Sequence, residues 1–229
     1  AIEIKNVHKT YAKSGRSTSA TTALKGVSLS VPSGDFFALL GSNGAGKTTL
    51  IGILTGIVAK TEGEVRIHGI SIDEHPDQAK TYIGVVPQEM NFSIFEKVID
   101  IILDQAGYYG IPRSEALPTA EQLLKDLGLW EKRNEKSQNL SGGMKRRLMI
   151  ARALIHKPKV LLLDEPTAGV DVELRRGMWE FLKKMNEEGT TIVLTTHYLE
   201  EAEQLSRHVA IINHGAILID ESTQGLLAR

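Results

Sequence analysis

Apolar residues follow two different patterns along the chain, and each pattern predicts one kind of element. Alternating or continuous apolar runs predict strands at residues 2–11, 24–31, 36–40, 64–68, 83–86, 160–163, 190–195, 209–213 and 216–220. Helices are expected at residues 48–55, 98–109, 116–129, 141–156, 173–186 and 199–204. Because strands alternate with helices, we expect a mixed α/β fold with a mainly parallel core sheet and an antiparallel β portion at the N-terminal end.

The stretch from 94 to 139 differs from the rest, since it has helical periodicity and no convincing strand. We therefore predict one domain over residues 1–229, in which residues 1–90 and 141–229 form the core and residues 91–140 form an inserted helical lobe. Residues 13–22 are rich in Ser, Thr and Gly, which predicts a flexible loop between the first two strands.

A glycine-rich segment joins the predicted strand 36–40 to the predicted helix 48–55. The segment consists of Gly41, Ser42, Asn43, Gly44, Ala45, Gly46, Lys47 and Thr48, followed by Thr49. It fits G-x-x-x-x-G-K-[ST] in the strand, loop and helix context that this phosphate-binding pattern requires. The glycines let backbone N–H groups turn toward phosphate oxygens, the lysine can reach the β- and γ-phosphates, and the Thr48 hydroxyl can ligate Mg²⁺. We expect a nucleoside triphosphate site here, with Thr49 as a further phosphate donor.

The buried strand 160–163 ends in two carboxylates, Asp164 and Glu165. Ligands collect at the carboxyl ends of parallel strands, so these acids can face the same phosphates as the glycine loop. We expect Asp164 to bind the metal, directly or through water, and Glu165 to orient or deprotonate the water that attacks the γ-phosphate.

A second anion site is predicted at Ser141, Gly142 and Gly143, which open a helix and leave its first backbone N–H groups bare. The glycine loop already accounts for one triphosphate, so a second anion site requires a different phosphate. Two copies arranged head to tail would supply it, each copy covering the nucleotide of the other.

Composition excludes several classes of protein. Cysteine is absent, which excludes disulfide frameworks and thiolate metal sites. Lys and Arg total 27 against 28 acidic residues, and the net charge of −1 gives no reason to expect nucleic acid. We interpret the basic run Lys145, Arg146 and Arg147 as the solvated face of a helix. No stretch approaches the roughly 20 apolar residues that span a bilayer, nor does the N-terminus resemble a signal peptide, so we expect an intracellular chain that is soluble by itself.

The ordered set of motifs resembles the nucleotide-binding subunit of an ATP-binding cassette (ABC) transporter over essentially the whole chain. Residues 91–92, 105–110, 140–152, 164–171 and 195–202 are similar to the ATPase subunits of bacterial ABC-2-type exporters. The resemblance implies a P-loop NTPase fold of the ABC type. It also implies ATP hydrolysis coupled to transport across a membrane, with ATP and Mg²⁺ bound.

The resemblance further implies roles for single residues. Tyr11 would stack on the adenine, and Gln88 would sense both Mg²⁺ and the attacking water. His197 would contact the γ-phosphate and Glu165, and Asp171 would contact the site of the other copy. The metal would then be held by Thr48, Gln88 and Asp164, and the partner's ATP by Ser141, Gly142 and Gly143. Met144 departs from the pattern, because many members carry glutamine there.

The same resemblance implies two partners. One is a second copy of the chain, bound head to tail around two Mg²⁺·ATP. The other is a separate integral membrane permease, whose cytoplasmic helix would be gripped by the helical lobe, especially residues 92–109. We therefore expect the chain at the inner face of the cell membrane, powering export. The transported substrate stays open among drug, lipid, polysaccharide and peptide, because another polypeptide builds the pathway.

Two alternatives share part of this pattern. A soluble ABC ATPase, such as an iron–sulfur assembly ATPase, would use the same site chemistry. An inactive nucleotide-sensing module is disfavoured, since Lys47, Asp164, Glu165 and His197 are all intact.

Overall fold

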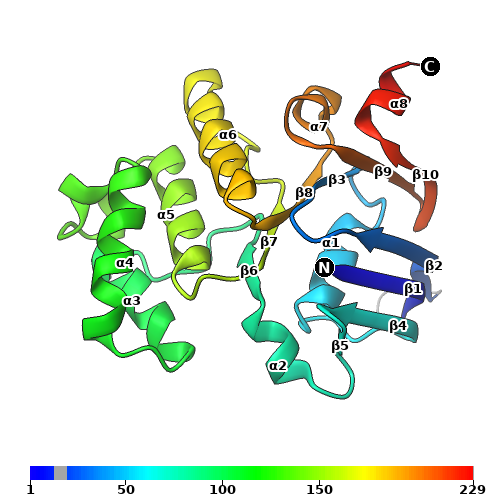
Figure 1. Cartoon of the computed structure of the whole chain (residues 1–229), viewed down its shortest axis with the longest axis horizontal. Coiled ribbons are helices and arrows are strands. Elements are labelled where there is room, and N and C mark those ends of the chain that lie inside the picture. The colour runs from blue at the N-terminus through cyan, green and yellow to red at the C-terminus, as the bar shows by residue number, and fades with distance from the viewer. Residues whose placement is uncertain (13–19, 229) are drawn as a thin grey trace.

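A computed structural model describes residues 1–12 and 20–228, so most of the loop predicted at 13–22 lies outside the described residues. The rest of that prediction falls largely on strand β2 (Thr21–Val31), which begins before the predicted residue 24. Figure 1 shows the described chain as a helical lobe on one side, a central sheet, and a second sheet on the other side.

The central sheet has six strands in the order β10-β9-β3-β8-β7-β6. These strands are β3 (Phe36–Leu40), β6 (Ile83–Val86), β7 (Val160–Asp164), β8 (Thr191–Thr196), β9 (His208–Asn213) and β10 (Ala216–Ser222). Neighbours from β9 to β6 run parallel, and β10 pairs antiparallel with β9. The register pairs Leu40 with Thr196 and Asp164 with Thr195, so three strands end at one edge of the sheet.

Strand β7 shows why the continuous apolar runs form central strands. Every residue of β7 is buried, yet alternate side chains enter different apolar clusters. Leu161 and Leu163 pack with the helices of one face, whereas Val160 and Leu162 pack with those of the other. A strand that is covered on both faces needs apolar residues at every position, which is the pattern that the sequence has there.

The second sheet is antiparallel, in the order β2-β1-β4-β5. It comprises β1 (Ile2–Tyr11), β2, β4 (Glu62–Ile67) and β5 (Ile70–Ser71). Helix α1 (Lys47–Leu54) contacts both sheets, and its buried side chains share one apolar cluster with them. The predicted antiparallel portion at the N-terminal end is confirmed, and it fixes the position of α1 over the central sheet.

The helical lobe contains α3 (Val98–Tyr108), α4 (Arg113–Asp126) and the short 3₁₀ helices Trp130–Lys132 and Ser137–Asn139. Helix α5 (Gly142–Leu154) contacts α3 and α4, and it also contacts β6 of the central sheet. One apolar cluster therefore runs from the lobe through α5 to the sheet. The division of the chain at residue 141 stays a prediction, because α5 packs against both parts.

Helices α6 (Val172–Glu187) and α7 (Leu199–Leu205) match the predicted ones closely. The short elements α2 (Pro76–Thr81), β5 and α8 (Thr223–Leu227) were not predicted. Across the described residues, we find no helix with the length and apolar character needed to cross a bilayer.

Candidate nucleotide site

The glycine loop follows β3 directly and leads into α1. Gly44 and Gly46 have φ angles of 79° and 114°, in the left-handed region that glycine adopts without a steric cost. At Gly41, an added Cβ would lie 2.5 Å from the carbonyl oxygen of Ile212. The loop therefore requires glycine at these positions, because its backbone is turned left-handed and packs tightly on β9.

Lys47 lies in the interior of the loop, with 4% of its surface exposed. Its Nζ donates to the carbonyl oxygens of Gly41 at 2.8 Å and Ser42 at 3.1 Å. The same Nζ lies 3.2 Å from Glu165 Oε1. The first turn of α1 and the end of β7 thus place one cation against one carboxylate.

Glu165 is buried just beyond β7 and has a φ angle of 47°. A left-handed conformation costs a residue other than glycine about 1–3 kcal/mol, so the surroundings must hold it there. Its backbone N–H donates to Thr195 Oγ1 at 3.0 Å, and its Oε2 lies 3.3 Å from His197 Nδ1. The structure thereby brings together Lys47, Glu165 and His197, from three segments far apart in sequence.

Thr195 is a site residue that the sequence analysis missed. Its hydroxyl donates to Asp164 Oδ1 and accepts from the Glu165 backbone N–H. Asp164 and Thr195 are both buried and are paired in the register of β7 and β8. A threonine in a buried strand is usually interpreted as a core residue. Only the pairing of β7 with β8 shows that Asp164 is its partner.

A cavity of about 210 Å³ lies over the glycine loop. It is lined by Ala23, Asn43, Gly44, Gly46, Lys47, Thr48, Thr49, Gln88 and Glu165. Of the other predicted loop residues, Ser42 is exposed, whereas Ala45 is buried and donates its N–H to Ser42 O at 3.1 Å. Tyr11 stands beside the cavity, partly exposed, with its hydroxyl 3.4 Å from Thr49 Oγ1.

Gln88 reaches this cavity from the segment after β6, and Arg146 holds that segment. The guanidinium of Arg146 donates to the carbonyl oxygens of Pro87 and Gln88, each at 2.9 Å. Arg146 is 6% exposed, so interpreting the run 145–147 as a solvated face was wrong for this residue. Burial lowers the pKa of the Arg146 guanidinium, and the nearby charge of Asp164 opposes that shift. Arg147 is also half-buried and donates to Leu127 O at 2.8 Å.

The predicted second anion site lies on the surface. Ser141 caps α5 by accepting a hydrogen bond from the Met144 N–H at 3.3 Å. Ser141 and Gly142 are exposed, and neither they nor Gly143 line the cavity over the glycine loop. A Cβ on Gly143 would lie 2.5 Å from Leu174 Cδ1, which places the start of α5 beside the start of α6.

Asp171 caps α6 and is exposed as well. Its Oδ1 accepts from the Leu174 N–H at 3.0 Å. Ser141 and Asp171, both predicted to contact another copy, therefore cap two neighbouring helices. The starts of these helices meet where Leu174 approaches Gly143. The structure groups these residues with each other and apart from Lys47.

Glu201, a buried acid, is a second residue that the sequence analysis missed. It lies on α7, four residues after His197, and is 2% exposed. Its Oε1 accepts from Thr167 Oγ1 at 2.7 Å and from Trp179 Nε1 at 3.2 Å. Glu201 thus links the segment after Glu165 and helix α6 to the helix that follows His197.

Comparison with known proteins gives one consistent result. The family model described as "ABC transporter" matches residues 24–168. The linearmycin resistance ATP-binding protein LnrL of Bacillus subtilis (strain 168) is 36% identical over 228 residues, covering 100% of this chain and 71% of that protein. The Nod factor export ATP-binding protein I of Paraburkholderia xenovorans (strain LB400) is 38% identical over 228 residues, covering 100% of this chain and 73% of that protein.

Solved structures agree with this result. A dimeric bacterial ABC transporter cassette is similar with a TM-score of 0.87 and 32% identity, covering 97% of this chain and 99% of that one. A dimeric post-hydrolysis state of an ATP-binding cassette, bound to ADP and Pi, is similar with a TM-score of 0.86 and 30% identity, at the same coverage. The fold similarity thus extends over nearly the whole chain.

Proposed function

Because the chain belongs to the ABC transporter family, we propose that it is the ATPase subunit of an exporter, in which two copies pair head to tail around two ATP molecules. As a member of this family, the chain binds and hydrolyses ATP. The names of its relatives, one for Nod factor export and one for linearmycin resistance, support an exporter over an iron–sulfur assembly ATPase.

The observation that carries the proposal is a site divided between two surfaces. One surface holds Lys47 and Glu165 in a lined cavity, and the other presents the bare helix start at Ser141 outside that cavity. Helix N-termini favour anions, so both surfaces suit phosphate. A second copy related by a twofold axis would bring its Ser141 over the first copy's ATP, and the reverse contact would follow by symmetry. Similar cassettes have been solved as dimers, one of them bound to ADP and Pi, which supports a dimer of this chain.

The contacts of Lys47 and Glu165 suggest the order of events during hydrolysis. The γ-phosphate competes with Glu165 for the Lys47 ammonium, because a triphosphate carries more negative charge than one carboxylate. Once released, Glu165 can accept a proton from the attacking water while the bond between the γ-phosphorus and the bridging oxygen breaks. His197, 3.3 Å from Glu165, would hold the carboxylate and contact the γ-phosphate.

The residues fit Mg²⁺, which takes oxygen ligands and is commonly held by one or two carboxylates plus substrate phosphates. Among the described residues, we find no group of three or more His, Cys, Asp or Glu that could hold a metal alone. Thr48 and Gln88 line the cavity, and Asp164 lies buried next to Glu165. We assign the ion to these three residues together with the phosphates of ATP, where it would neutralise charge on the γ-phosphate.

The membrane partner completes the proposal. The helical lobe would contact a cytoplasmic helix of a separate permease, which would place the chain on the inner face of the cell membrane. Closure of the ATP-bound dimer would then drive the permease, and hydrolysis would reopen the dimer.

The variant Glu165→Gln tests the proposal. It keeps the shape of the side chain but removes the proton acceptor, so turnover should fall about 10²-fold or more while ATP still binds. ATP should then convert the purified variant from monomer to dimer, as measured by light scattering. Glu187→Gln, on the exposed side of α6, serves as the control and should hydrolyse ATP normally. Unchanged turnover in Glu165→Gln, or a variant that stays monomeric with ATP, would contradict the proposal.

A further inference from the structure

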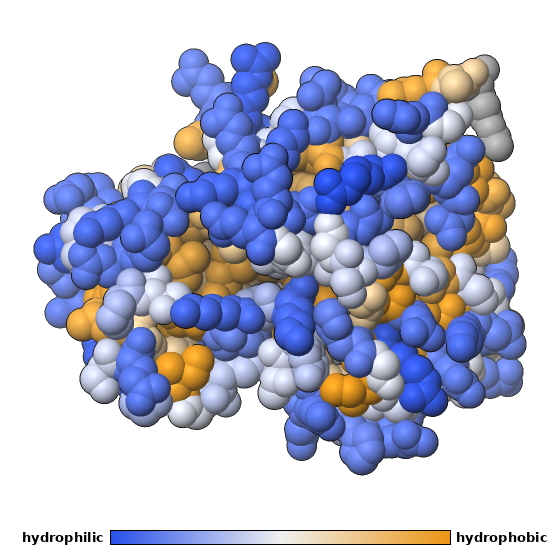
Figure 2. Space-filling model, in the orientation of Figure 1, coloured by the Kyte–Doolittle hydropathy of each residue, from blue (hydrophilic) through white to orange (hydrophobic). Residues whose placement is uncertain are grey.

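Charged side chains of this protein lie mostly in water, and most of the face shown in Figure 2 is hydrophilic. Six charged side chains are nonetheless buried: Asp35, Lys47, Arg146, Asp164, Glu165 and Glu201. In the part of the chain that the structure describes, all of them except Asp164 have two or more polar partners. Within the same residues, the Asp164 carboxylate accepts one hydrogen bond, from the Thr195 hydroxyl, and forms no ion pair. Asp164 is therefore the least compensated of these six charges.

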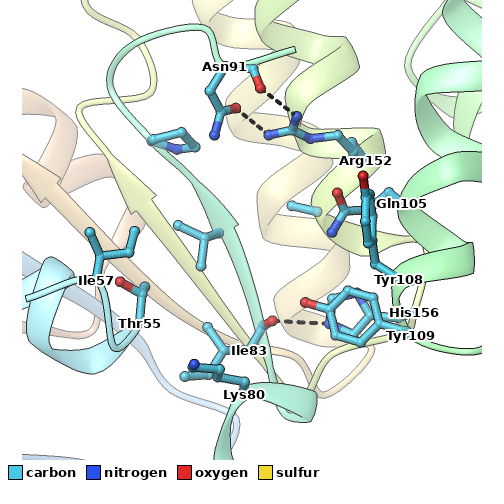
Figure 3. Close-up of a pocket in the computed structure, with 13 residues that line it drawn as sticks. Thr55, Ile57, Lys80, Ile83, Asn91, Gln105, Tyr108, Tyr109, Arg152 and His156 are labelled. Atoms are coloured by element: carbon cyan, nitrogen blue, oxygen red, sulfur yellow. Dashed lines mark hydrogen bonds between the residues drawn. The ribbon is translucent and has the colours of Figure 1, made fainter. Parts of the chain in front are cut away.

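Arg152 also lacks an ion pair among the described residues, but its surroundings differ from those of Asp164. It lines a cleft of about 440 Å³ between the helical lobe and the central sheet, and it is partly exposed there (Figure 3). Its guanidinium donates to both the carbonyl oxygen and Oδ1 of Asn91. Asp164, in contrast, is 3% exposed, and the Arg146 charge acts on it without forming a bond to it. A buried carboxylate with so few partners favours a bound cation.

The Thr195 hydroxyl has one proton, and its surroundings direct that proton to Asp164. Thr195 is 0% exposed, and its Oγ1 accepts a hydrogen bond from the Glu165 backbone N–H at 3.0 Å. Because a backbone N–H can only donate, this bond uses a lone pair of the hydroxyl oxygen and leaves the proton for Asp164 Oδ1. Oδ1 is therefore held by an O–H donor, and Oδ2 is left as an oxygen ligand for a cation.

Strand β8 places this hydroxyl between the two halves of the nucleotide site. Its register pairs Thr195 with Asp164 of β7 on one side and with Leu39 of β3 on the other. The carbonyl oxygen of the next residue, Thr196, accepts from the Gly41 N–H at 3.2 Å. The end of β8 thus fixes the first residue of the glycine loop and the Asp164 carboxylate relative to each other.

We propose that Thr195 is a positioning residue for Mg²⁺, whose hydroxyl holds the Asp164 carboxylate so that one oxygen is left for the ion bound with ATP. The inference rests on the proposed function, and it assigns part of the metal affinity to a residue that does not contact the metal. Residues that orient a metal ligand typically contribute about 10–100-fold to metal affinity. Without the hydroxyl, the Asp164 carboxylate could rotate, and binding of the ion would have to order it.

Thr195→Val tests the inference, because it removes the hydroxyl and keeps the branched shape that suits a buried strand. The Glu165 N–H keeps an acceptor in this variant, since it also donates to the Thr195 carbonyl oxygen at 3.1 Å. Calorimetric titrations of a non-hydrolysable ATP analogue, with Mg²⁺ and with EDTA, give the factor by which Mg²⁺ strengthens nucleotide binding. By linkage, the chain strengthens Mg²⁺ binding to the nucleotide by the same factor. Thr195→Val should lower this factor about tenfold or more and leave the affinity in EDTA unchanged.

Two further variants separate positioning from stability. Thr195→Ser keeps the hydroxyl, so the factor should stay near its unaltered value even though the lost methyl group lowers the melting temperature. Thr191→Val makes the same change at the other end of β8, where the buried hydroxyl accepts from the Gly34 N–H at 2.9 Å. This matched control should lower the melting temperature and leave the factor unchanged.

Asp164→Asn shows whether Thr195 acts through Asp164. In that background Thr195→Val should lower the factor little further, because the ligand that it positions has already lost its charge. An unchanged factor in Thr195→Val, a lost factor in Thr195→Ser, or full additivity with Asp164→Asn would each overturn the inference and leave the proposed function intact. Failure of the unaltered chain to bind the ATP analogue would instead overturn both.

Discussion

The two helix starts in this molecule suit the same kind of ligand but are built in opposite ways. At the start of α1, Lys47 is buried, the glycines are left-handed, and a carboxylate and two carbonyl oxygens surround the ammonium. At the start of α5, Ser141 is exposed, and its side chain caps its own helix by accepting from the Met144 N–H. The first site is enclosed by its own chain, and the second is open to solvent.

The difference teaches how much of each site one chain supplies. A buried charged group must find its partners within the fold, since leaving it unpaired costs several kcal/mol. An exposed helix start is hydrated in the single chain and carries no such cost. It can therefore remain without a ligand until a second copy presents a phosphate. The burial of Lys47 against the exposure of Ser141 is therefore what a divided site requires.

The largest effect is expected from Ser141→Arg. A long cation at the open helix start would replace the contact that Ser141 makes with the partner's nucleotide, but the glycine loop of the same chain, whose cavity Ser141 does not line, would be unchanged. Turnover should fall about 10²-fold or more, as when one preorganised phosphate contact is removed, while the affinity of the single chain for ATP stays the same. ATP titration and phosphate release on one sample measure both quantities. Loss of ATP binding in this variant would show that the two helix starts are not independent.

The same substitution at the two sites sharpens the comparison further. Gly41→Ala should lower the free energy of unfolding by about 1–3 kcal/mol and weaken ATP binding, because the added Cβ meets the Ile212 carbonyl oxygen. The Cβ added by Gly142→Ala would have no atom within 4 Å, and the residue lies in the first turn of a helix. This variant should keep the free energy of unfolding or raise it by up to about 1 kcal/mol. Urea unfolding measures the free energy of unfolding of both variants. An equal loss in the two variants would contradict the comparison.

The sequence predicts an element or a site residue well when the signal lies in consecutive residues, and poorly when it depends on residues far apart in the chain. The glycine loop and β7 were predicted within a few residues, because a phosphate-loop pattern and a strand buried on both faces are legible in consecutive residues. Helix α2 was missed, since its six residues bury only Ala79 and give no apolar period. Residues defined by distant partners were also missed. Thr195 and Glu201 look like ordinary residues of a strand and a helix until β7 and α6 pack beside them.

The role of Arg146 was also missed, because its partners lie in a distant segment of the chain. Arg146 links α5 to the Gln88 carbonyl oxygen, and this contact gives the next prediction. Arg146→Gln would remove the bonds to the Pro87 and Gln88 carbonyl oxygens, which hold the segment that carries Gln88. We expect turnover to fall about tenfold, equivalent to about 1.4 kcal/mol, with little change in ATP affinity. Steady-state kinetics would separate these effects. A change in ATP affinity alone, with turnover intact, would remove Arg146 from the positioning of Gln88.

The smallest effect on stability is expected at His156, just past the end of α5. His156 is half-buried, whereas Ser141 at the start of the same helix is exposed. Burial lowers the pKa of His156 below 6.5, although its bond to Ile83 O opposes the shift. His156 is therefore protonated more readily in the unfolded chain than in the folded chain. The folded state consequently loses stability as the pH falls below about 6.5. His156→Phe can keep the stacking on Tyr109, whose ring lies 3.6 Å away.

Melting temperatures of this variant should fall less steeply than those of the unaltered chain between pH about 7.5 and about 5.5. Its melting temperature at neutral pH is not the test, since losing the bond to Ile83 O lowers stability at every pH. An unchanged slope in His156→Phe would show that His156 is protonated equally in both states.

Mixing two inactive variants tests the divided site most directly. Lys47→Ala removes the glycine-loop cation and Ser141→Arg blocks the open helix start, so each variant alone should hydrolyse almost no ATP. In a head-to-tail dimer of one of each, both defects fall in the same site and the other site is intact. An equal mixture should therefore recover about a quarter of the unaltered turnover, because about half of the dimers are mixed and each has one working site of two. A mixture as inactive as its components would contradict the shared site.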